Sequence, residues 1–182
     1  MLKATGPAII HKSDVGGVRL NLQTLEQVRQ AYREMSTRLG PAMHGAIVQA
    51  MAPEGIEMII GGVAHETFGP LIMVGLGGVN TELLADRAFR VPPIDRAEAG
   101  RMIGELRCAP LLHGYRGLPE ADVRALSDQI VRVGRLMDDQ PDIAELDLNP
   151  VIVTPDDAMA VDARVRLAHA PPLPSPFRRR LR

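Results

Sequence analysis

The stretch Glu145-Leu-Asp-Leu-Asn-Pro150, with the apolar run Val151-Ile-Val-Thr154 behind it, decides the fold that this chain is expected to adopt. Two acidic groups and one amide alternate with leucines, so on a β-strand the polar side chains lie on one face and the leucines on the other. Pro150 cannot donate a hydrogen bond to a neighbouring strand, so the strand should end or bend there. The stretch therefore predicts a strand with one face toward a core and one face that bears oxygen atoms.

Two interpretations of the oxygen-bearing face are open. Glu145, Asp147 and Asn149 carry hard oxygen ligands, which on a rigid strand suit Mg²⁺, an ion that takes one or two carboxylates and keeps several waters. The alternative is an edge strand with a solvated polar face. Asp162 is expected on the next strand, because Pro155-Asp-Asp157 is a turn signal. If that hairpin forms, Asn149 and Asp162 can converge on one ion.

The composition is typical of a soluble globular protein. Of 182 residues, 46% are hydrophobic and 24% are charged, and the net charge is −1, which gives no bulk attraction to nucleic acid or an acidic membrane. No apolar run approaches the roughly 18 residues of a membrane span, and the start lacks the layout of a signal peptide. The single cysteine, Cys108, fits a reducing compartment. A cytoplasmic protein that binds neither nucleic acid nor membrane is expected.

The N-terminal half is expected to alternate strands with one helix. Thr24 and Gln27 form a capping box at the start of an apolar helical stripe that Gly40 ends. The strands predicted here cover residues 8–10, 18–22, 46–51, 55–61 and 71–74. The turn signal Pro53-Glu-Gly55 predicts that the strands on either side of it pair as an antiparallel hairpin.

The C-terminal half is expected to run helix, helix, strand, strand. Asp95 caps the first helix, with Glu98 completing a capping box, and Pro119 is placed as the first residue of a second helix that runs to Asp138. The strands predicted here cover residues 143–154 and 158–163. The last residues, 169–182, are rich in Pro and Arg and are expected to be disordered.

Two glycine-rich loops could bring backbone N–H groups close to an anion, because no Cβ intervenes. They are Gly16-Gly17 and Gly75-Leu-Gly-Gly78, and neither matches the phosphate-loop or dinucleotide-binding patterns. A tight turn is the alternative for each. Lys3 and Lys12, the only lysines, lie close in sequence to the first loop, which suggests phosphate neutralisation; a solvated surface lysine is the alternative.

Five segments occur in an order that resembles a known family. They are His11-Lys-Ser-Asp-Val-Gly-Gly-Val18, Phe68-Gly-Pro70, Gly75-Leu-Gly-Gly78, Gly114-Tyr-Arg-Gly117 and Glu145-Leu-Asp-Leu-Asn-Pro150. The series resembles the ATP-grasp domain of ADP-forming acyl-CoA synthetases, relatives of succinyl-CoA synthetase, which also ends multidomain bacterial protein acetyltransferases. The resemblance implies an α/β (α+β) ATP-grasp fold, with mixed or antiparallel sheets and flanking helices, over residues 1–168.

The resemblance also implies site residues. Lys3 matches a lysine that contacts nucleotide phosphates, and Glu57 matches an acid just after the hinge strand that borders adenine. The nucleotide-binding positions implied in this way are Lys3, Gly16, Gly17, Gln49, Ala50, Met51 and Glu57. The Mg²⁺ positions implied are Asn149 and Asp162, with Asp147 beside them.

The implied activity is the conversion of an acid, CoA and ATP to acyl-CoA, ADP and phosphate through a phosphohistidine. In the family that histidine lies on a mobile segment of a CoA-ligase domain, and in some members the histidine that matches His11 is thought to pass the phosphate to ADP. Neutral imidazole is nucleophilic near pH 7, which suits this role. The implied ligands are ATP or ADP and Mg²⁺, and the implied partner is a CoA-binding, CoA-ligase domain or subunit, in a hetero- or homo-oligomer. The alternative is a non-catalytic or regulatory remnant, as in a protein acetyltransferase.

The chain also departs from the family pattern. Relatives carry an N-terminal lobe segment before the lysine that matches Lys3, and they carry CoA-binding and CoA-ligase domains. His65-Glu66 stands where relatives usually have a charged pair ending in Asp. We therefore expect an incomplete N-terminal lobe, and a fragment, a split subunit or a misplaced start codon.

Overall fold

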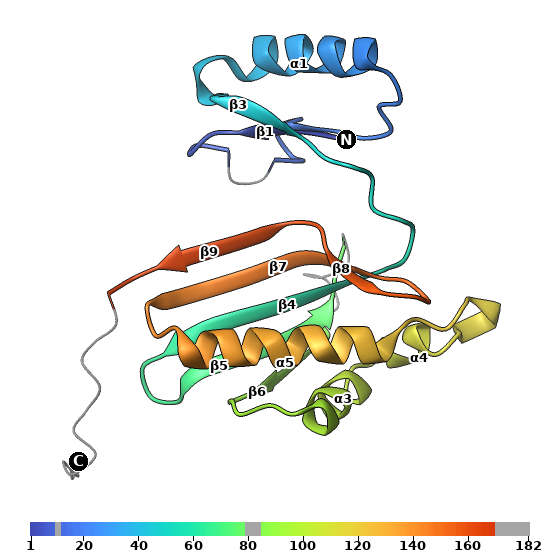
Figure 1. The fold of residues 1–182 in the computed structure, drawn as a ribbon, viewed down its shortest axis with the longest axis vertical. Coiled ribbons are helices and arrows are strands. Elements are labelled where there is room, and N and C mark those ends of the chain that lie inside the picture. Colours follow the sequence, from blue (N-terminus) through green and yellow to red (C-terminus); the bar gives the residue numbers. More distant parts are fainter. Residues whose placement is uncertain (10–11, 79–84, 170–182) are drawn as a thin grey trace. The chain divides into compact units, whose positions relative to one another are not determined.

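The chain divides into two units, Met1–Ala52 and Pro53–Arg182, and each has a hydrophobic core of its own (Figure 1). The structure is a computed structural model that describes residues 1–9, 12–78 and 85–169. His11 and nearly all of the predicted disordered tail therefore lie outside the described residues. Among the helices that are described, none is long and apolar enough to cross a membrane.

The first unit is a small antiparallel sheet with one helix packed on it (Figure 1). Leu2 and Ala4 point from the central strand to the helix, where Met35 is fully buried. The Gln27 N–H donates to Thr24 Oγ1 (3.2 Å), and the Gln27 side chain accepts from the Thr24 N–H, which confirms the predicted capping box. The elements are β1 (Leu2–Thr5), β2 (Val18–Arg19), α1 (Leu25–Leu39), the 3₁₀ turn η1 (Gly40–Ala42) and β3 (Gly45–Val48), with the strand order β2-β1-β3.

The strand predicted over residues 8–10 is wrong for its described part. The Ile9 N–H donates to the Gly6 carbonyl (3.0 Å) and closes a turn, and Pro7 has no N–H to give to a strand. Ile9 is still buried, because the turn brings its side chain back into the core of this unit. Apolar character therefore identified burial here, and not strand geometry.

The predicted hairpin across Pro53-Glu-Gly55 is also wrong. β3 pairs with β1 in the first unit, whereas β4 (Ile56–His65) pairs with other strands in the second unit. Gly55 is needed for a close approach of two backbones, since a Cβ there would lie 2.6 Å from the Val153 carbonyl oxygen. The Pro-Glu-Gly signal thus marks the passage from one unit to the other.

The second unit is an antiparallel sheet with helices on one of its faces (Figure 1). The strands of this sheet in the described residues are β4, β5 (Gly69–Leu76), β6 (Arg87–Arg90), β7 (Ile143–Val153), β8 (Ala158–Ala160) and β9 (Ala163–Leu167). Their order is β6-β5-β4-β7-β8, and β9 also pairs with β7. The helices are α3 (Arg96–Gly104), α4 (Ala109–Leu112), the 3₁₀ turn η2 (Tyr115–Gly117) and α5 (Val123–Asp139).

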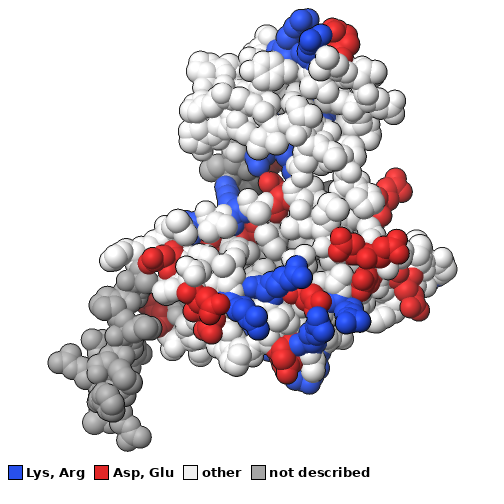
Figure 2. Space-filling view, viewed as in Figure 1, with Lys and Arg blue, Asp and Glu red and all other residues white. Residues whose placement is uncertain are grey.

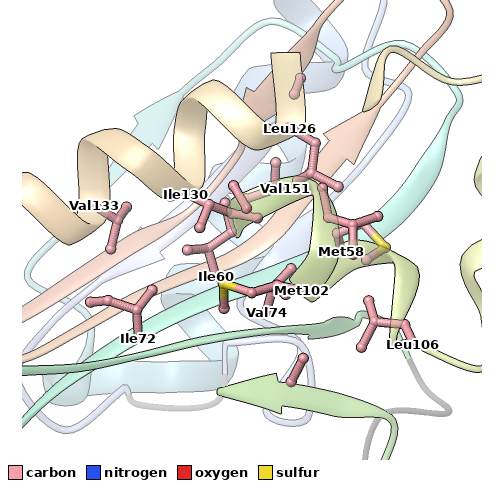
Figure 3. Packing of buried hydrophobic residues seen from close by; sticks show 14 of the residues in the cluster. Met58, Ile60, Ile72, Val74, Met102, Leu106, Leu126, Ile130, Val133 and Val151 are labelled. Atoms are coloured by element: carbon pink, nitrogen blue, oxygen red, sulfur yellow. The ribbon is translucent and has the colours of Figure 1, made fainter. Parts of the chain in front are cut away.

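The core of the second unit lies between its helices and one face of the sheet. Apolar residues on one side of α5 pack against alternate residues of β4, β5 and β7 (Figure 3). The apolar residues repeat about every 3.6 positions in the helix and every second position in the strands. Side chains that are fully buried there include Met58, Ile60, Ile72, Val74, Met102, Leu126, Ile130 and Val151. On the face of this unit visible in Figure 2, acidic and basic side chains are interspersed, in keeping with a net charge of −1.

Two helix starts in this unit differ from prediction. The second helix begins at Val123, where Asp122 accepts the Ala125 N–H (2.9 Å), and Glu120 instead forms a bridge with His113, so Pro119 is not its first residue. Asp95 caps α3 as predicted and accepts the Glu98 N–H (2.7 Å). The Glu98 carboxylate, however, does not complete a capping box.

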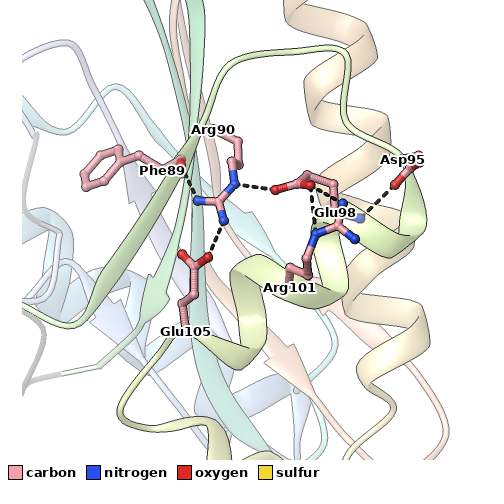
Figure 4. Close-up of polar contacts among 6 residues, drawn as sticks. All are labelled: Phe89, Arg90, Asp95, Glu98, Arg101 and Glu105. Carbon is pink, nitrogen blue, oxygen red and sulfur yellow. Dashed lines mark hydrogen bonds and ion pairs between the residues drawn. The ribbon is translucent and has the colours of Figure 1, made fainter.

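Glu98 instead belongs to an ion-pair cluster that joins α3 to the sheet (Figure 4). Arg90 of β6 donates to Glu98 and Glu105, and Arg101 also donates to Glu98. The guanidinium of Arg90 is held between these carboxylates, which raises its pKa. The cluster fixes the edge strand β6 against the helix that covers it.

Candidate functional site

The opening stretch of sequence forms a bulge at Asn149 and Pro150 within a continuous strand. Leu148 lies opposite Ile60 and Val151 lies opposite Met58, so two residues of β7 face one residue of β4. This confirms that the strand bends at Pro150, although it does not end there. On its other side β7 pairs with β9 before the bulge and with β8 after it.

Asp162 lies beside this bulge, in the connection between β8 and β9. The Asn149 N–H donates to the Asp162 carbonyl (3.1 Å), and the Val161 N–H donates to the Pro150 carbonyl (2.9 Å). The strand predicted over residues 158–163 is split in two, so Asp162 is on a connection and not within a strand. The structure nevertheless brings the backbones of Asn149 and Asp162 together.

Asp147 belongs to the same neighbourhood and is partly buried. Burial raises the pKa of its carboxyl above the ordinary value; the positive charge of Arg164 opposes this rise and the negative charge of Asp162 adds to it. The carboxylates of Asp147 and Asp162 carry charge of the same sign, so a cation bound between them would offset both charges. The negative charges of Asp147 and Asp162 therefore favour a cation at this place.

The donors present here fit a hard divalent cation. The described residues contain no group of three or more His, Cys, Asp or Glu able to hold a metal. An ion at the bulge would therefore rest on the carboxylates of Asp147 and Asp162, the amide oxygen of Asn149 and water. That donor set suits Mg²⁺, which keeps several waters and needs few protein carboxylates. The role of these residues as ligands stays a prediction.

Glu145 is occupied elsewhere. Arg166 Nη2 lies 2.6 Å from Glu145 Oε1, and this hydrogen bond holds the pKa of Glu145 below its ordinary value. Glu145 and Asp147 both line one cavity of about 360 Å³, so they share a face of the sheet as predicted. Leu146 between them is buried on the opposite face, in the core.

The first unit carries the predicted phosphate-contacting residues. Lys3 lies on β1 and is only 9% exposed. The N–H of Gly16 donates to Ser13 (3.1 Å) and that of Gly17 to Lys12 (2.6 Å), so the loop is a tight turn, with Gly16 at φ +70°. The turn alternative accounts for these backbone N–H groups, and a phosphate contact by this loop stays a prediction.

The predicted hinge residues follow the end of β3, which stops at Val48. Gln49 pairs with the chain start, since its N–H donates to the Met1 carbonyl (3.0 Å) and its carbonyl accepts from the Met1 amino group (2.7 Å). Ala50 and Met51 continue without regular structure, and Met51 is 44% exposed.

Glu57, at the start of β4, lies beside the second glycine loop. The Gly77 N–H donates to the Glu57 carbonyl (2.7 Å), and a Cβ on Gly78 would come within 2.8 Å of Glu57 Oε2. Glycine is required at Gly77, where a Cβ would lie 2.9 Å from the Glu57 carbonyl oxygen, and at Gly78 the φ of +76° favours it. The contact between Glu57 and the loop was not predicted, because it depends on how β4 and β5 pair.

Two further charged residues were missed by sequence reasoning. Asp86 is buried and accepts the backbone N–H groups of Arg107 (2.9 Å) and Cys108 (2.7 Å). Arg164 lies directly opposite Asp147 on β9. The alternation of Arg164 and Arg166 with apolar residues is the signal that could have identified β9 as a strand with a basic face.

A model of the ATP-grasp domain matches residues 1–167. The chain belongs to the ATP-grasp domain family. Its antiparallel sheets with flanking helices are the fold that the resemblance implied, which confirms that expectation. The domain of this family binds nucleotide.

The relatives are acid–thiol ligases. The beta subunit of ADP-forming acetate–CoA ligase I from Pyrococcus furiosus is 41% identical over 92% of this chain and 74% of that subunit. ADP-forming acetate–CoA ligase I from Archaeoglobus fulgidus is 40% identical over 92% of this chain, but this is only 25% of that longer protein. The chain thus spans most of a beta subunit and a quarter of the longer ligase.

Solved structures agree with this placement. Acetyl-coenzyme A synthetase 1 of Ca. Korarchaeum cryptofilum, in complex with coenzyme A and Ca-AMPCP, has a TM-score of 0.87 and 45% identity, over 92% of this chain and 75% of that one. A second structure of the same synthetase holds coenzyme A and Mg-AMPPCP, with a phosphohistidine segment that points towards the nucleotide binding site (TM-score 0.83, 44% identity, 92% of this chain and 76% of that one).

Proposed function

We propose that this chain is the nucleotide-binding part of an ADP-forming acyl-CoA synthetase. The observation that carries the proposal is the cluster of Asp147, Asn149 and Asp162 at the β7 bulge, in a chain 41% identical to a beta subunit of that enzyme class. The reaction consumes an acid, CoA and ATP and yields acyl-CoA, ADP and phosphate. No observation favours the alternative of a non-catalytic remnant.

The partner that we propose is a CoA-ligase subunit that carries the main phosphohistidine. The support comes from two sources: a beta subunit implies a separate companion, and a relative's structure contains a phosphohistidine segment directed at its nucleotide site. The acyl substrate would be bound by that partner. Acetate is the first acid to test, because the relatives include acetate–CoA ligases. His11 is proposed to carry the phosphoryl group within this chain.

The metal-side residues have a defined task in this proposal. Asn149 and Asp162, with Asp147 beside them, would hold Mg²⁺. When bound, the ion offsets negative charge on the phosphate oxygens that develops during phosphoryl transfer. Lys3 adds a cationic group of this chain for the phosphates. Gln49, Ala50 and Met51 are proposed to border the base, with Glu57, Gly16 and Gly17 as further nucleotide-binding positions.

Calorimetric titration with Mg-ATP tests the binding half of the proposal. Asn149→Ala and Asp162→Ala are each expected to weaken binding by at least about tenfold, since loss of even an outer-shell partner of a metal typically costs that much. Glu145→Ala is the matched control on the same strand, because its carboxylate is engaged by Arg166, and binding should be unchanged. Equal affinity in all the variants would contradict the metal assignment.

Turnover tests the remaining half. With a CoA-ligase partner subunit, acetate and CoA, the chain should form ADP from ATP, and His11→Ala should abolish that formation while leaving Mg-ATP binding intact. Nucleotide binding without any turnover in the presence of the partner would instead support the regulatory alternative.

A further inference from the structure

The sheet of the second unit has a cavity on the face that its helices leave open. Gly62 faces α5, since a Cβ there would meet Met137 at 2.9 Å, so its neighbour Gly61 faces the other way. Strand register then places a row of residues across this open face, each directly opposite the next: Phe89, Met73, Gly61, Asp147 and Arg164. All five line the cavity of about 360 Å³.

Gly61 gives this cavity its depth. A Cβ on Gly61 would lie 3.2 Å from Met73 Cε, so any larger residue would fill the middle of the row. The side toward β5 and β6 is apolar, with Phe89 half exposed, whereas the side toward β7 and β9 carries Asp147 and Arg164. The cavity thus has an apolar side and a charged side, and the charged side adjoins the β7 bulge.

The two arginines of the charged side differ in what they face. Arg166 donates to Glu145 at 2.6 Å, so its charge is offset within the sheet. Arg164 is exposed and lies opposite Asp147, whose pKa its charge acts to lower, but the described residues place no carboxylate within the 4.0 Å ion-pair distance of its guanidinium. A guanidinium presents a planar fork of donors that matches phosphate oxygens. Arg164 is therefore positioned to take an anion beside a cluster of oxygen ligands.

We propose that Arg164 contacts the phosphoryl group as it passes between ATP and its acceptor histidine, and that it lowers the barrier to that transfer. The inference rests on the proposed function. In the ATP-consuming direction the lone pair of a neutral imidazole nitrogen forms the P–N bond, while the bond from the γ-phosphorus to ADP breaks and its electron pair leaves with ADP. Arg164 donates to the oxygens of the transferring group from the cavity side.

The matched variants are Arg164→Gln and Arg166→Gln, which remove the same charge from the same strand and the same cavity. In the complex with a CoA-ligase partner, Arg164→Gln is expected to lower kcat for ADP formation about 10²-fold, the usual effect of removing one such donor. The Kd for Mg-ATP should stay unchanged, because the contact forms with the group in transfer. Arg166→Gln should change kcat by no more than about fivefold, as for an exposed ion pair, and Arg164→Lys should recover part of the rate.

The outcomes distinguish a failure of the proposed function from a failure of the role given to Arg164. If the wild-type complex forms no ADP, the proposed function fails and this inference fails with it. If the wild type is active and Arg164→Gln is equally active, or falls no further than Arg166→Gln, only the inference is overturned. The same holds if Arg164→Gln weakens Mg-ATP binding as much as it lowers kcat. Thermal unfolding of each variant checks that the fold is retained, as expected for an exposed residue of β9.

Discussion

Asp86 shows what a single buried charge contributes to the second unit. Its side chain is largely buried, with 8% of the residue exposed, and it accepts the N–H groups of Arg107 and Cys108. Burial acts to raise the pKa of Asp86, but the hydrogen bonds from Arg107 and Cys108 and the charge of Arg107 bring it below its ordinary value of 3.8. The carboxylate thus binds the residues just before α4 to the start of β6, which Asp86 directly precedes.

Asp86→Asn tests this account through the pH dependence of stability. The amide keeps one oxygen, so one backbone N–H is left unpaired, and the free energy of unfolding should fall by about 1–3 kcal/mol at pH 7. Because the folded pKa lies below the unfolded one, the stabilisation by Asp86 is complete above pH 3.8 and is lost as the pH falls through the folded value. Urea titrations from pH 3 to pH 7 should therefore show the two proteins converging at the acid end.

Asp156→Asn is the control for that experiment, since Asp156 is an exposed carboxylate of the same unit. Its stability curve should follow the wild type throughout. A constant difference between Asp86→Asn and the wild type down to the lowest pH would contradict the role given to the Asp86 charge.

Cys108 provides a second measurement at this scale. The thiol is buried beside Asp86, and burial raises its pKa to about 12. The reactive thiolate is therefore scarce at pH 8, and a disulfide reagent should label the native protein only as fast as the second unit opens. Full labelling within the mixing time, without denaturant, would contradict this burial. The signal is unambiguous because Cys108 is the only cysteine in the chain.

At the scale of elements, the contact of α5 with β4 depends on a missing side chain. A Cβ on Gly62 would lie 2.9 Å from Met137 Cγ, close to the helix backbone, where the side chain cannot easily move away. Gly62→Ala should therefore lower the free energy of unfolding by about 1–3 kcal/mol, the usual cost of overpacking.

The control is Gly100→Ala in α3, where nothing lies within 4 Å of the added atom. It should raise the stability by about 0.5–1 kcal/mol, because Ala loses less conformational freedom in a helix than Gly does. Chemical denaturation of both variants gives the comparison, and equal effects of the same sign would refute the close packing at Gly62.

The elements that could be predicted from sequence are those whose determinants are local. α1 begins at a capping box and carries an apolar stripe, so its limits follow from neighbours in the chain. The mistaken pairing of β3 with β4 could not be avoided from the sequence, because β3 pairs back with β1 at the start of the chain, and β4 lies between its sequence neighbour β5 and the distant β7, about ninety positions on. A turn signal gives the bend of the chain but not which strands the bend separates.

The candidate site shows the same limit. Asn149 and Asp162 could be placed together because one turn signal lies between them and the strands on either side of that turn, β7 and β8, were recognisable. Arg164 could not be placed in this way, because its position opposite Asp147 depends on the register of β9. The last predicted strand ended at residue 163, where β9 begins. Residues whose neighbours are set by long-range register are the ones that the sequence leaves unidentified.

At the scale of the whole molecule, the two units differ in how much core each can form. The core of the first unit consists of Leu2, Ala4, Ile9, Ala31 and Met35, with a few partly buried neighbours. The core of the second unit draws on the strands from β4 to β8 and on its helices. A unit with little buried apolar surface has little stability to spare, so the first unit should open more readily than the second.

Hydrogen exchange followed by mass spectrometry tests this difference. Amides of β1 and α1 should exchange before those of β4 and β7. Met35→Ala removes a fully buried side chain from the small core, at a cost of about 2–5 kcal/mol. It should accelerate exchange throughout the first unit and leave β4 and β7 unchanged. Leu126→Ala, an equally buried change in the other core, should do the reverse. If either change accelerated exchange equally in both units, the chain would unfold as one cooperative body, and the division into two cores would carry no energetic meaning.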